Sequence, residues 1–526
     1  MPRLAWSMSG GTLSAHGSRM AAANSRGFLW RWSLRFIWSV ALVFATIVIG
    51  GALDARRRLP ELQPWHRIVP PDAGARTLTT SSTLADYLTI EERAFRTVRE
   101  EIEDTLAPAW KLPANRYNRE GRSHPSRFGT DWNRTQILSP DVEPIGGAVL
   151  VHGLTDAPYS LRTIGEDLRA RGYLVVVLRM PGHGTVPAGL IGVTWEDWLA
   201  AVRVAARDIR RRIGAGTPLV LVGYSNGGAQ VLKYALDVIE GSGDPPADRL
   251  VLLSPMIGVT RLAWLARVIS LLGPLPPFEK ARWLDVYPEY NPFKYNSFPA
   301  NAGLQTWRLT TTLQSQIARV AEAGRGRELP PILTFNSLVD ATVSTPAIVH
   351  ALYDVIADER SELVLFDINR SSGLVPFIRP ADAALVAQLA DDRPRKYRRT
   401  MITNADPSSL DVVERTAAPG TTTITTRPLG LAWPRDVYSL SHVAIPFPMS
   451  DPVYGREEAA SQPETIRLGV LSPRGERAVL TVPSDTLMRL TCNPFFSYLN
   501  DRIAAWVDSL SPLPAAERSH SYEPPK

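Results

Sequence analysis

The chain has a single cysteine and, beyond its first residues, no excess of positive charge. With Cys492 alone among 526 residues, no intramolecular disulfide, zinc finger or iron–sulfur cluster can form. The net charge is +6, but residues 1–58 hold eight arginines and one acid, Asp54, which leaves a net −1 for residues 59–526. Nucleic-acid binding requires clustered cations, so we expect no nucleic-acid partner.

Internal repeats and metal-ligand clusters at a useful spacing are also lacking. We therefore expect neither a metal nor a cofactor. At 44% hydrophobic and 21% charged residues, the composition is that of a globular protein, which excludes collagen-like, coiled-coil and wholly disordered chains.

The N-terminal region contains the longest apolar run. Residues 36–53, FIWSVALVFATIVIGGAL, carry no charge and follow Trp30 and Trp32, a pattern that favours one membrane-spanning helix behind a basic tail, 1–35. A cleaved secretory signal is the alternative, but the run is long for a signal and ALDA at 52–55 is a poor cleavage site. We predict a single-pass membrane anchor, with arginines on both flanks leaving its orientation open.

After the anchor, the composition predicts a tether and then a folded domain. Within 54–130, residues 59–80 are rich in proline and small residues, as in a linker, and 83–106 have the periodicity of an amphipathic helix. Residues 131–510 are predicted to form the main domain, and 511–526 a frayed tail.

From Gly146 onward, short apolar runs alternate with helical patterns. The runs AVLVHG, YLVVVLRM and PLVLVGYS are separated by predicted helices at 160–171 and 195–213, and a further helix begins at Asn226. Continuous valine and leucine runs, each followed by a helix, are typical of parallel strands that are covered on both faces. The sequence thus predicts an α/β fold with a mostly parallel, doubly wound sheet.

The motif GYSNGG places a serine between a strand and a helix. Ser225 follows the run PLVLV, and glycines stand two residues before and after it, at Gly223 and Gly227. A nucleophile on a tight turn needs small neighbours at these positions so that its hydroxyl can project above the sheet. The alternative is a glycine-rich turn in which Ser225 merely caps the helix.

A serine nucleophile of this type is followed in the chain by an acid and then by a histidine. Of the later histidines, His350 lies in a helical pattern and His520 in the tail, whereas His442 lies in a loop, SLSHVAIPF, and is the preferred base.

For the acid we prefer Asp340, which follows the predicted strand ILTFNS at the end where parallel sheets gather their ligands. Asp367 and Asp451 are its rivals. An aspartate in this place would hold the histidine tautomer and stabilise the imidazolium.

The motifs HGLTDAPYS, RMPGHG, GYSNGG, SLVDATV and SLSHVAIPF together resemble the α/β-hydrolase superfamily, especially its monoacylglycerol lipases, bacterial carboxylesterases and serine-aminopeptidase-like members. The resemblance covers 130–345 and the surroundings of His442. It implies a carboxylic ester hydrolase with Ser225, Asp340 and His442 as catalytic residues, and with the backbone N–H groups of Leu154 and Asn226 as oxyanion donors.

Two stretches exceed a minimal hydrolase domain. An aromatic-rich stretch at about 257–330 is expected to form a helical cap over the serine, and about 370–432 reads as an insertion between Asp340 and His442 that could shape the site.

The expected partner is a small-molecule or lipid ester. An acyltransferase or a serine peptidase could use the same three residues, and an inactive hydrolase-fold binding module is the alternative from another class.

Overall fold

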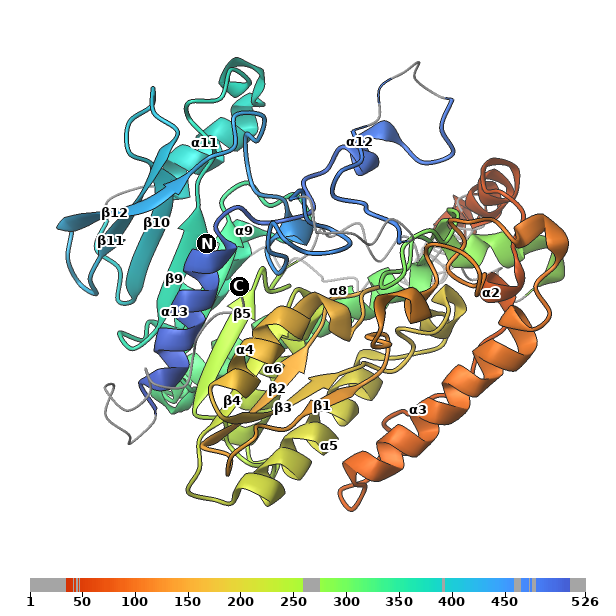
Figure 1. Cartoon of the computed structure of the whole chain (residues 1–526), viewed down its shortest axis with the longest axis horizontal. Helices are drawn as coiled ribbons and strands as arrows, with labels where there is room; N and C mark the ends of the chain where they lie inside the picture. Colours follow the sequence, from red (N-terminus) through yellow and green to blue (C-terminus); the bar gives the residue numbers. More distant parts are fainter. Residues whose placement is uncertain are drawn as a thin grey trace, which may run out of the picture.

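The computed structural model describes residues 35–40, 42, 43, 46, 48–258, 275–389, 393–457, 465–472, 474 and 479–510. Its centre is a ten-stranded sheet in the order β1-β3-β2-β4-β5-β8-β9-β10-β11-β12 (Figure 1). The strands from β3 to β10 in this order are mutually parallel, whereas β1, β11 and β12 pair antiparallel. This confirms the predicted mostly parallel sheet. The bounds are β1 Gln136–Leu138, β2 Gly146–Val151, β3 Tyr173–Leu178, β4 Leu219–Tyr224, β5 Arg249–Leu253, β8 Ile332–Ser337, β9 Glu362–Phe366, β10 Arg398–Asn404, β11 Asp411–Ala417 and β12 Ile424–Ala432.

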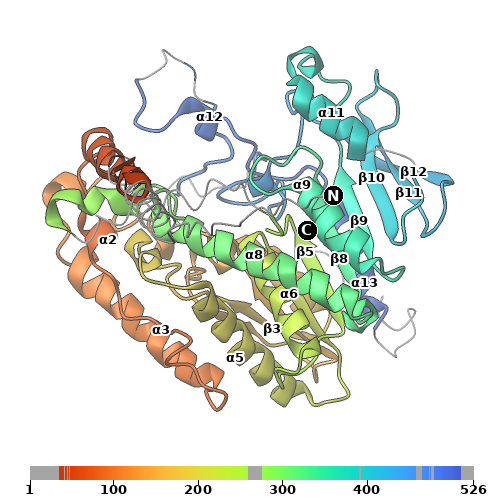
Figure 2. The same ribbon diagram turned by 180° about the vertical axis from the view of Figure 1, so that it is seen from behind.

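Helices cover both faces of the sheet, because successive strand residues point to opposite sides. In β2, Val149 and Val151 belong to one hydrophobic core, and Ala148 and Leu150 to the other. Helices α3, α5, α6 and α8 pack on the first core, and α4 and α13 on the second; Figure 2 shows the α8 side and Figure 1 the α13 side. Their bounds are α3 Leu84–Val98, α4 Arg162–Ala170, α5 Trp195–Ile213, α6 Asn226–Ile239, α8 Ala300–Glu322 and α13 Phe496–Asp508.

The insertion predicted at 370–432 extends the sheet instead of shaping the site. It supplies α11 (Pro380–Leu389) and strands β10 to β12 at one end of the sheet (Figure 1). The chain leaves and returns at one point, since the Asn369 backbone N–H donates to the Tyr438 carbonyl at 2.8 Å and its side-chain amide to the Val437 carbonyl at 2.9 Å. The two ends of the insertion are therefore adjacent, and the chain continues from there to His442.

The cap is smaller than predicted. Residues 259–274 lie outside the described residues, and 275–299 form a 3-10 segment, Pro276–Arg282, and two short strands, β6 (Trp283–Asp285) and β7 (Phe298–Pro299). From Ala300 onward the chain is α8, whose Leu309, Leu313 and Ile317 are buried in the main core. Because α8 is the crossover helix between β5 and β8, it belongs to the body, and the predicted cap boundary near 330 is wrong.

The segment predicted as a tether, 59–80, packs against the domain. Leu59 and Leu62 are buried beside Trp283, and α2 (Pro64–Arg67) buries Trp65. Arg67 also pairs with Glu279 of the 3-10 segment, with Nη2 2.6 Å from Oε1. The segment has the proline-rich composition of a linker, but its Leu59, Leu62 and Trp65 side chains are buried against the domain. The helix predicted at 83–106 is present as α3, which continues into a π-helical turn, Arg99–Glu103.

The predicted membrane span, 36–53, falls only partly on described residues, because 41, 44, 45 and 47 are outside them. Residues 35–40 and 48–58 are helical. In the part of the chain that the structure describes, no helix combines the length and the apolar character needed to cross a membrane. The anchor therefore stays a prediction.

Candidate active site

Ser225 lies at the junction of β4 and α6, at the carboxyl end of a central parallel strand. Its backbone has φ 55° and ψ −115°, a conformation that non-glycine residues rarely adopt. Although Ser225 occupies the N-cap position of α6, its side chain makes no capping hydrogen bond. The helix-capping interpretation of this serine therefore fails, and the strained backbone of Ser225 agrees with the turn expected of a nucleophile elbow.

The glycines around Ser225 are required by close backbone packing. A Cβ atom at Gly227 would lie 1.9 Å from the Val151 carbonyl oxygen, and one at Gly223 would lie 2.5 Å from the Gly227 carbonyl oxygen. Both distances are far below any real contact, so a side chain at Gly227 would push the turn away from β2, and one at Gly223 would push the start of α6 away from β4. The small residues predicted from the motif thus fix the position of Ser225.

Asp340 and His442 are brought together although 102 residues separate them in sequence. Asp340 follows β8, and its Oδ2 lies 2.9 Å from Nδ1 of His442. Its other oxygen, Oδ1, accepts hydrogen bonds from the backbone N–H groups of Thr342 at 2.7 Å and Val343 at 3.0 Å. The carboxylate therefore holds the ring by one oxygen and is itself held by the other.

Burial and hydrogen bonding act against each other on Asp340. Its side chain is fully buried, which would raise the pKa of the carboxyl, but the charge and hydrogen bond of His442 and the two backbone N–H groups outweigh burial and lower the pKa below its ordinary value. Asp340 is therefore an anion at neutral pH, as an orienting carboxylate must be.

The loop that carries His442 is fixed on three sides. The Ser337 hydroxyl, at the end of β8, donates to the Leu440 carbonyl at 2.9 Å, and the Ser441 hydroxyl donates to the Leu490 carbonyl. The ring of Tyr224, just before Ser225, stacks on the His442 ring with 5.4 Å between centroids. The histidine is thus positioned by both strands that carry its predicted partners.

The rival residues are engaged elsewhere. His350 pairs with Asp354 on the exposed side of its helix. Asp367 binds Arg370, and Asp451 binds Arg162. His520 lies outside the described residues.

The two predicted oxyanion donors lie on either side of the serine. Leu154 follows β2 and lines the same cavity as Ser225, and Asn226 is the first residue of α6. Within the described residues, neither backbone N–H donates to a protein acceptor. Both groups are therefore free to bind an oxygen above Ser225.

A cavity of about 350 Å³ opens over these residues, and both Ser225 and His442 line it. Three charged side chains that the sequence did not single out also line it: Asp156, Lys294 and Arg489. Lys294 comes from the cap and Arg489 from the segment after α12 (Ser484–Leu487). No periodicity or motif marks them, because only the tertiary fold brings these segments together.

The histidine of HGLT, His152, binds the backbone of its own loop and of the loop after β3. Nε2 of His152 accepts a hydrogen bond from the Met180 backbone N–H at 3.0 Å, and Nδ1 lies 2.8 Å from the Gly153 carbonyl oxygen. Burial lowers the pKa of His152 well below its ordinary value, so the ring is neutral and serves the backbone of the loop.

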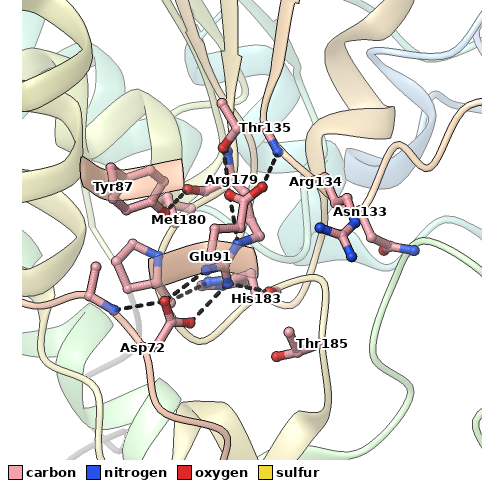
Figure 3. Close-up of polar contacts among 12 residues, drawn as sticks. Asp72, Tyr87, Glu91, Asn133, Arg134, Thr135, Arg179, Met180, His183 and Thr185 are labelled. Atoms are coloured by element: carbon pink, nitrogen blue, oxygen red, sulfur yellow. Dashed lines mark hydrogen bonds and ion pairs between the residues drawn. The ribbon is translucent and has the colours of Figure 1, made fainter. Parts of the chain in front are cut away.

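A buried cluster around Arg179 ties the N-terminal segment to the loop RMPGHG (Figure 3). The Arg179 guanidinium is fully buried and binds both oxygens of Asp72, at 2.7 and 2.9 Å, and Oε2 of Glu91, at 3.0 Å. It also donates to the His183 carbonyl at 2.8 Å, and the Tyr87 hydroxyl donates to the Arg179 carbonyl at 2.5 Å. Sequence analysis missed this cluster, since Asp72 lies in the segment predicted as a tether.

Part of the chain is similar in sequence to known hydrolases. Residues 143–367 match the family model described as Serine aminopeptidase, S33. A thermostable monoacylglycerol lipase of Bacillus sp. (strain H-257) is 26% identical over 219 residues, which make up 41% of this chain and 79% of the lipase.

Solved structures are similar at lower identity. LipS and LipT, two metagenome-derived lipolytic enzymes, are represented by a chain that is 19% identical, with a TM-score of 0.36 and coverage of 49% of this chain and 98% of the other. The monoacylglycerol lipase of Paleococcus ferrophilus is 18% identical, with a TM-score of 0.33 and coverage of 48% of this chain and 98% of the other. Residues 143–367 are thus similar to lipase- and esterase-like hydrolases, and the mostly parallel sheet supports an α/β-hydrolase fold for this part of the chain.

Proposed function

We propose that this protein is a serine hydrolase that cleaves carboxylic esters through an acyl-enzyme. In this mechanism His442 accepts the proton of the Ser225 hydroxyl as its oxygen attacks the ester carbonyl. Asp340 holds the ring tautomer and stabilises the imidazolium, and the N–H groups of Leu154 and Asn226 receive the oxyanion. The imidazolium then protonates the leaving alcohol, and water releases the acyl group by the same steps.

One observation carries this proposal: the 2.9 Å contact between His442 Nδ1 and Asp340 Oδ2 lies at the wall of the cavity that Ser225 also lines. A strained serine that caps nothing, in one cavity with a histidine held by a buried carboxylate, favours a catalytic site over an inactive binding module.

Hydrolysis of p-nitrophenyl esters of rising acyl length tests the proposal. The full chain is expected to hydrolyse them, and Ser225→Ala is expected to lower kcat by about 10⁴-fold or more. The chain-length optimum would report the size of the cavity. Equal rates for the full chain and Ser225→Ala would overturn the serine mechanism.

Peptide hydrolysis is the second candidate, because the matching family model is described as a serine aminopeptidase. Aminoacyl p-nitroanilides assayed beside the matching esters separate the two. A higher kcat/KM for the anilides would replace esters by amides and leave the roles of the three residues unchanged.

We also propose that residues 36–53 anchor the protein in a membrane. Apart from the sequence, the support is exposure: Phe36 is 71% exposed, Ile37 59% and Trp38 73%, although all three are strongly apolar. Alkaline extraction of membranes from expressing cells tests this. The full chain is expected to stay with the membrane, and a chain beginning at residue 59 is expected to be released; release of both would contradict the anchor.

A further inference from the structure

The cavity above Ser225 combines apolar lining residues, among them Leu154, Met256 and Phe298, with charged side chains. Two cationic side chains, Lys294 and Arg489, line it within the same 350 Å³ as Ser225 and His442. Pockets for small ligands are mostly apolar, and the few polar groups in them set orientation and specificity. Two cations of this kind therefore bear on which substrate the site accepts.

Lys294 is held over the loop HGLT by its two neighbours. The ring of Phe293 stacks on Tyr159 with 3.9 Å between centroids and 6° between planes, and the Tyr295 backbone N–H donates to the Thr155 carbonyl at 2.8 Å. The Tyr295 hydroxyl also donates to the Gly182 carbonyl at 3.0 Å. With both flanking residues buried and bonded, the backbone of Lys294 is fixed beside the predicted oxyanion loop.

Arg489 reaches the cavity from the C-terminal part of the chain. Its Nη2 donates to the Thr342 hydroxyl at 2.8 Å, two residues after Asp340. The next residue, Leu490, accepts the hydrogen bond of the Ser441 hydroxyl, just before His442. Arg489 is thus fastened to the two loops that present Asp340 and His442.

Among the described residues, neither Lys294 nor Arg489 forms an ion pair with an aspartate or a glutamate. Asp156 lies in the same cavity and acts on Lys294 only at longer range. Asp340 is engaged by His442 and the backbone. Burial and the neighbouring positive charge of Arg489 lower the pKa of Lys294, and the carboxylate of Asp156 only partly offsets them.

We propose that this site selects esters that carry an anionic group, a carboxylate or a phosphate, and that Lys294 and Arg489 bind this group while the ester carbonyl lies at Ser225. The inference rests on the proposed ester hydrolysis and adds a substrate class to it. The anion can belong to the acyl part or to the alcohol part of the ester. In either case Lys294 and Arg489 would together bind one carboxylate or phosphate group.

Two matched pairs of esters test the inference and separate the two sources. For the alcohol part, 1-decanoylglycerol is compared with 1-decanoylglycerol 3-phosphate; for the acyl part, p-nitrophenyl hexanoate is compared with mono-p-nitrophenyl adipate. In at least one pair the anionic ester is expected to have a kcat/KM at least about tenfold higher than the neutral ester. A hydrogen bond to a charged group contributes more binding free energy than a tenfold change requires. The pair that shows the preference identifies the side that carries the anion.

Variants then assign the preference to the cations. Lys294→Met and Arg489→Gln are each expected to lower the anionic-to-neutral ratio about tenfold, and Arg489→Glu to invert it. Thr342→Val removes the hydrogen bond of Arg489 but keeps its charge, so the ratio is expected to persist. Arg327→Gln, at a side chain that is 79% exposed, is the matched control for removing a distant cation.

The results distinguish failure of the inference from failure of the proposed function. Hydrolysis that requires Ser225 but prefers the neutral ester in both pairs overturns the anion selection alone. If no ester is hydrolysed, Ser225→Ala is titrated with 1-decanoylglycerol 3-phosphate and with 1-decanoylglycerol by calorimetry. Tighter binding of the phosphate, lost in the double variant with Arg489→Gln, supports the anion site without ester hydrolysis, and equal binding overturns it.

Discussion

Two clusters of charged side chains, one buried around Arg179 and one partly buried in the cavity above Ser225, differ in how completely their charges are paired. Around Arg179 nearly every donor and acceptor is used: Asp72 and Glu91 bind the guanidinium, and Thr135 and the Gly182 backbone bind the carboxylates. In the cavity above Ser225, the side chains of Asp156, Lys294 and Arg489 share a small space without forming an ion pair with any described residue. Both clusters contain acidic and basic side chains, but these form ion pairs only around Arg179.

The difference indicates what each cluster is for. A completed network of buried charges holds segments together, and removing one member leaves the others uncompensated. An incomplete network costs stability unless a ligand completes it, which is why poorly compensated charges gather at functional sites. The Arg179 cluster therefore fastens the N-terminal segment to the domain, whereas the unpaired charges of the cavity agree with the anion binding proposed above.

The largest effect on kcat is expected at Asp340, whose two carboxylate oxygens both accept hydrogen bonds. Asp340→Asn keeps the shape of the side chain but presents an amide to His442 and favours the wrong ring tautomer. A fall in kcat of about 10⁴-fold is expected, with the far-UV circular dichroism unchanged. Asp451→Asn, at a buried carboxylate outside the cavity, is the control for kcat. A comparable fall in kcat for both variants would mean that Asp340 has no special role.

On the other side of the contrast, Arg179→Met is expected to cost about 3–5 kcal/mol of the free energy of unfolding, because Asp72 and Glu91 would stay buried without their cation. Arg489→Met removes a cation that no described carboxylate partners, and we expect a change within about 0.5 kcal/mol. Urea denaturation of both variants measures this directly. Similar losses of the free energy of unfolding in the two variants would show that the two clusters do not differ in their contribution to stability.

Asp156 should give a smaller effect of opposite sign. Burial, only partly offset by Lys294, raises the pKa of Asp156 from 3.8 to about 6. A carboxyl whose pKa is higher in the folded state destabilises the fold when ionised, so its penalty grows as pH rises from about 4 to 6 and is complete above 6. Asp156→Asn, which mimics the neutral acid, is expected to gain up to about 3 kcal/mol at pH 7.5.

At pH below about 4 the gain of Asp156→Asn should vanish, because the acid is then protonated in both states. Denaturation curves at pH 4 and 7.5 provide the comparison. A gain that is the same at both pH values would show that packing, and not charge, is responsible.

The two regions also differ in how far the sequence predicts them. The elbow at Ser225 is predictable because strand, turn and helix are local, and Gly223 and Gly227 mark it at fixed spacing. Asp340 and His442 follow from chain order and from exclusion of residues in helices or tails, and the structure brings them into contact. These inferences need no knowledge of how distant segments meet.

Other features depend on tertiary contacts that leave no local pattern. Asp72 lies among prolines and small residues that resemble a linker, and only the position of Arg179 makes it a buried partner. The cap boundary was wrong because α8, a crossover helix, has the same amphipathic character as a cap helix. Lys294 and Arg489 are nearly 200 residues apart, and neither has a motif around it.

The most direct test of the account asks which residue is the nucleophile. The full chain is treated with a fluorophosphonate, and the modified peptide is identified by mass spectrometry, with His442→Ala as a second sample. We predict a single label on Ser225 and strongly slowed labelling in His442→Ala, because the hydroxyl then lacks its base. Label on another residue, or labelling of Ser225 at the same rate without His442, would contradict the proposed mechanism.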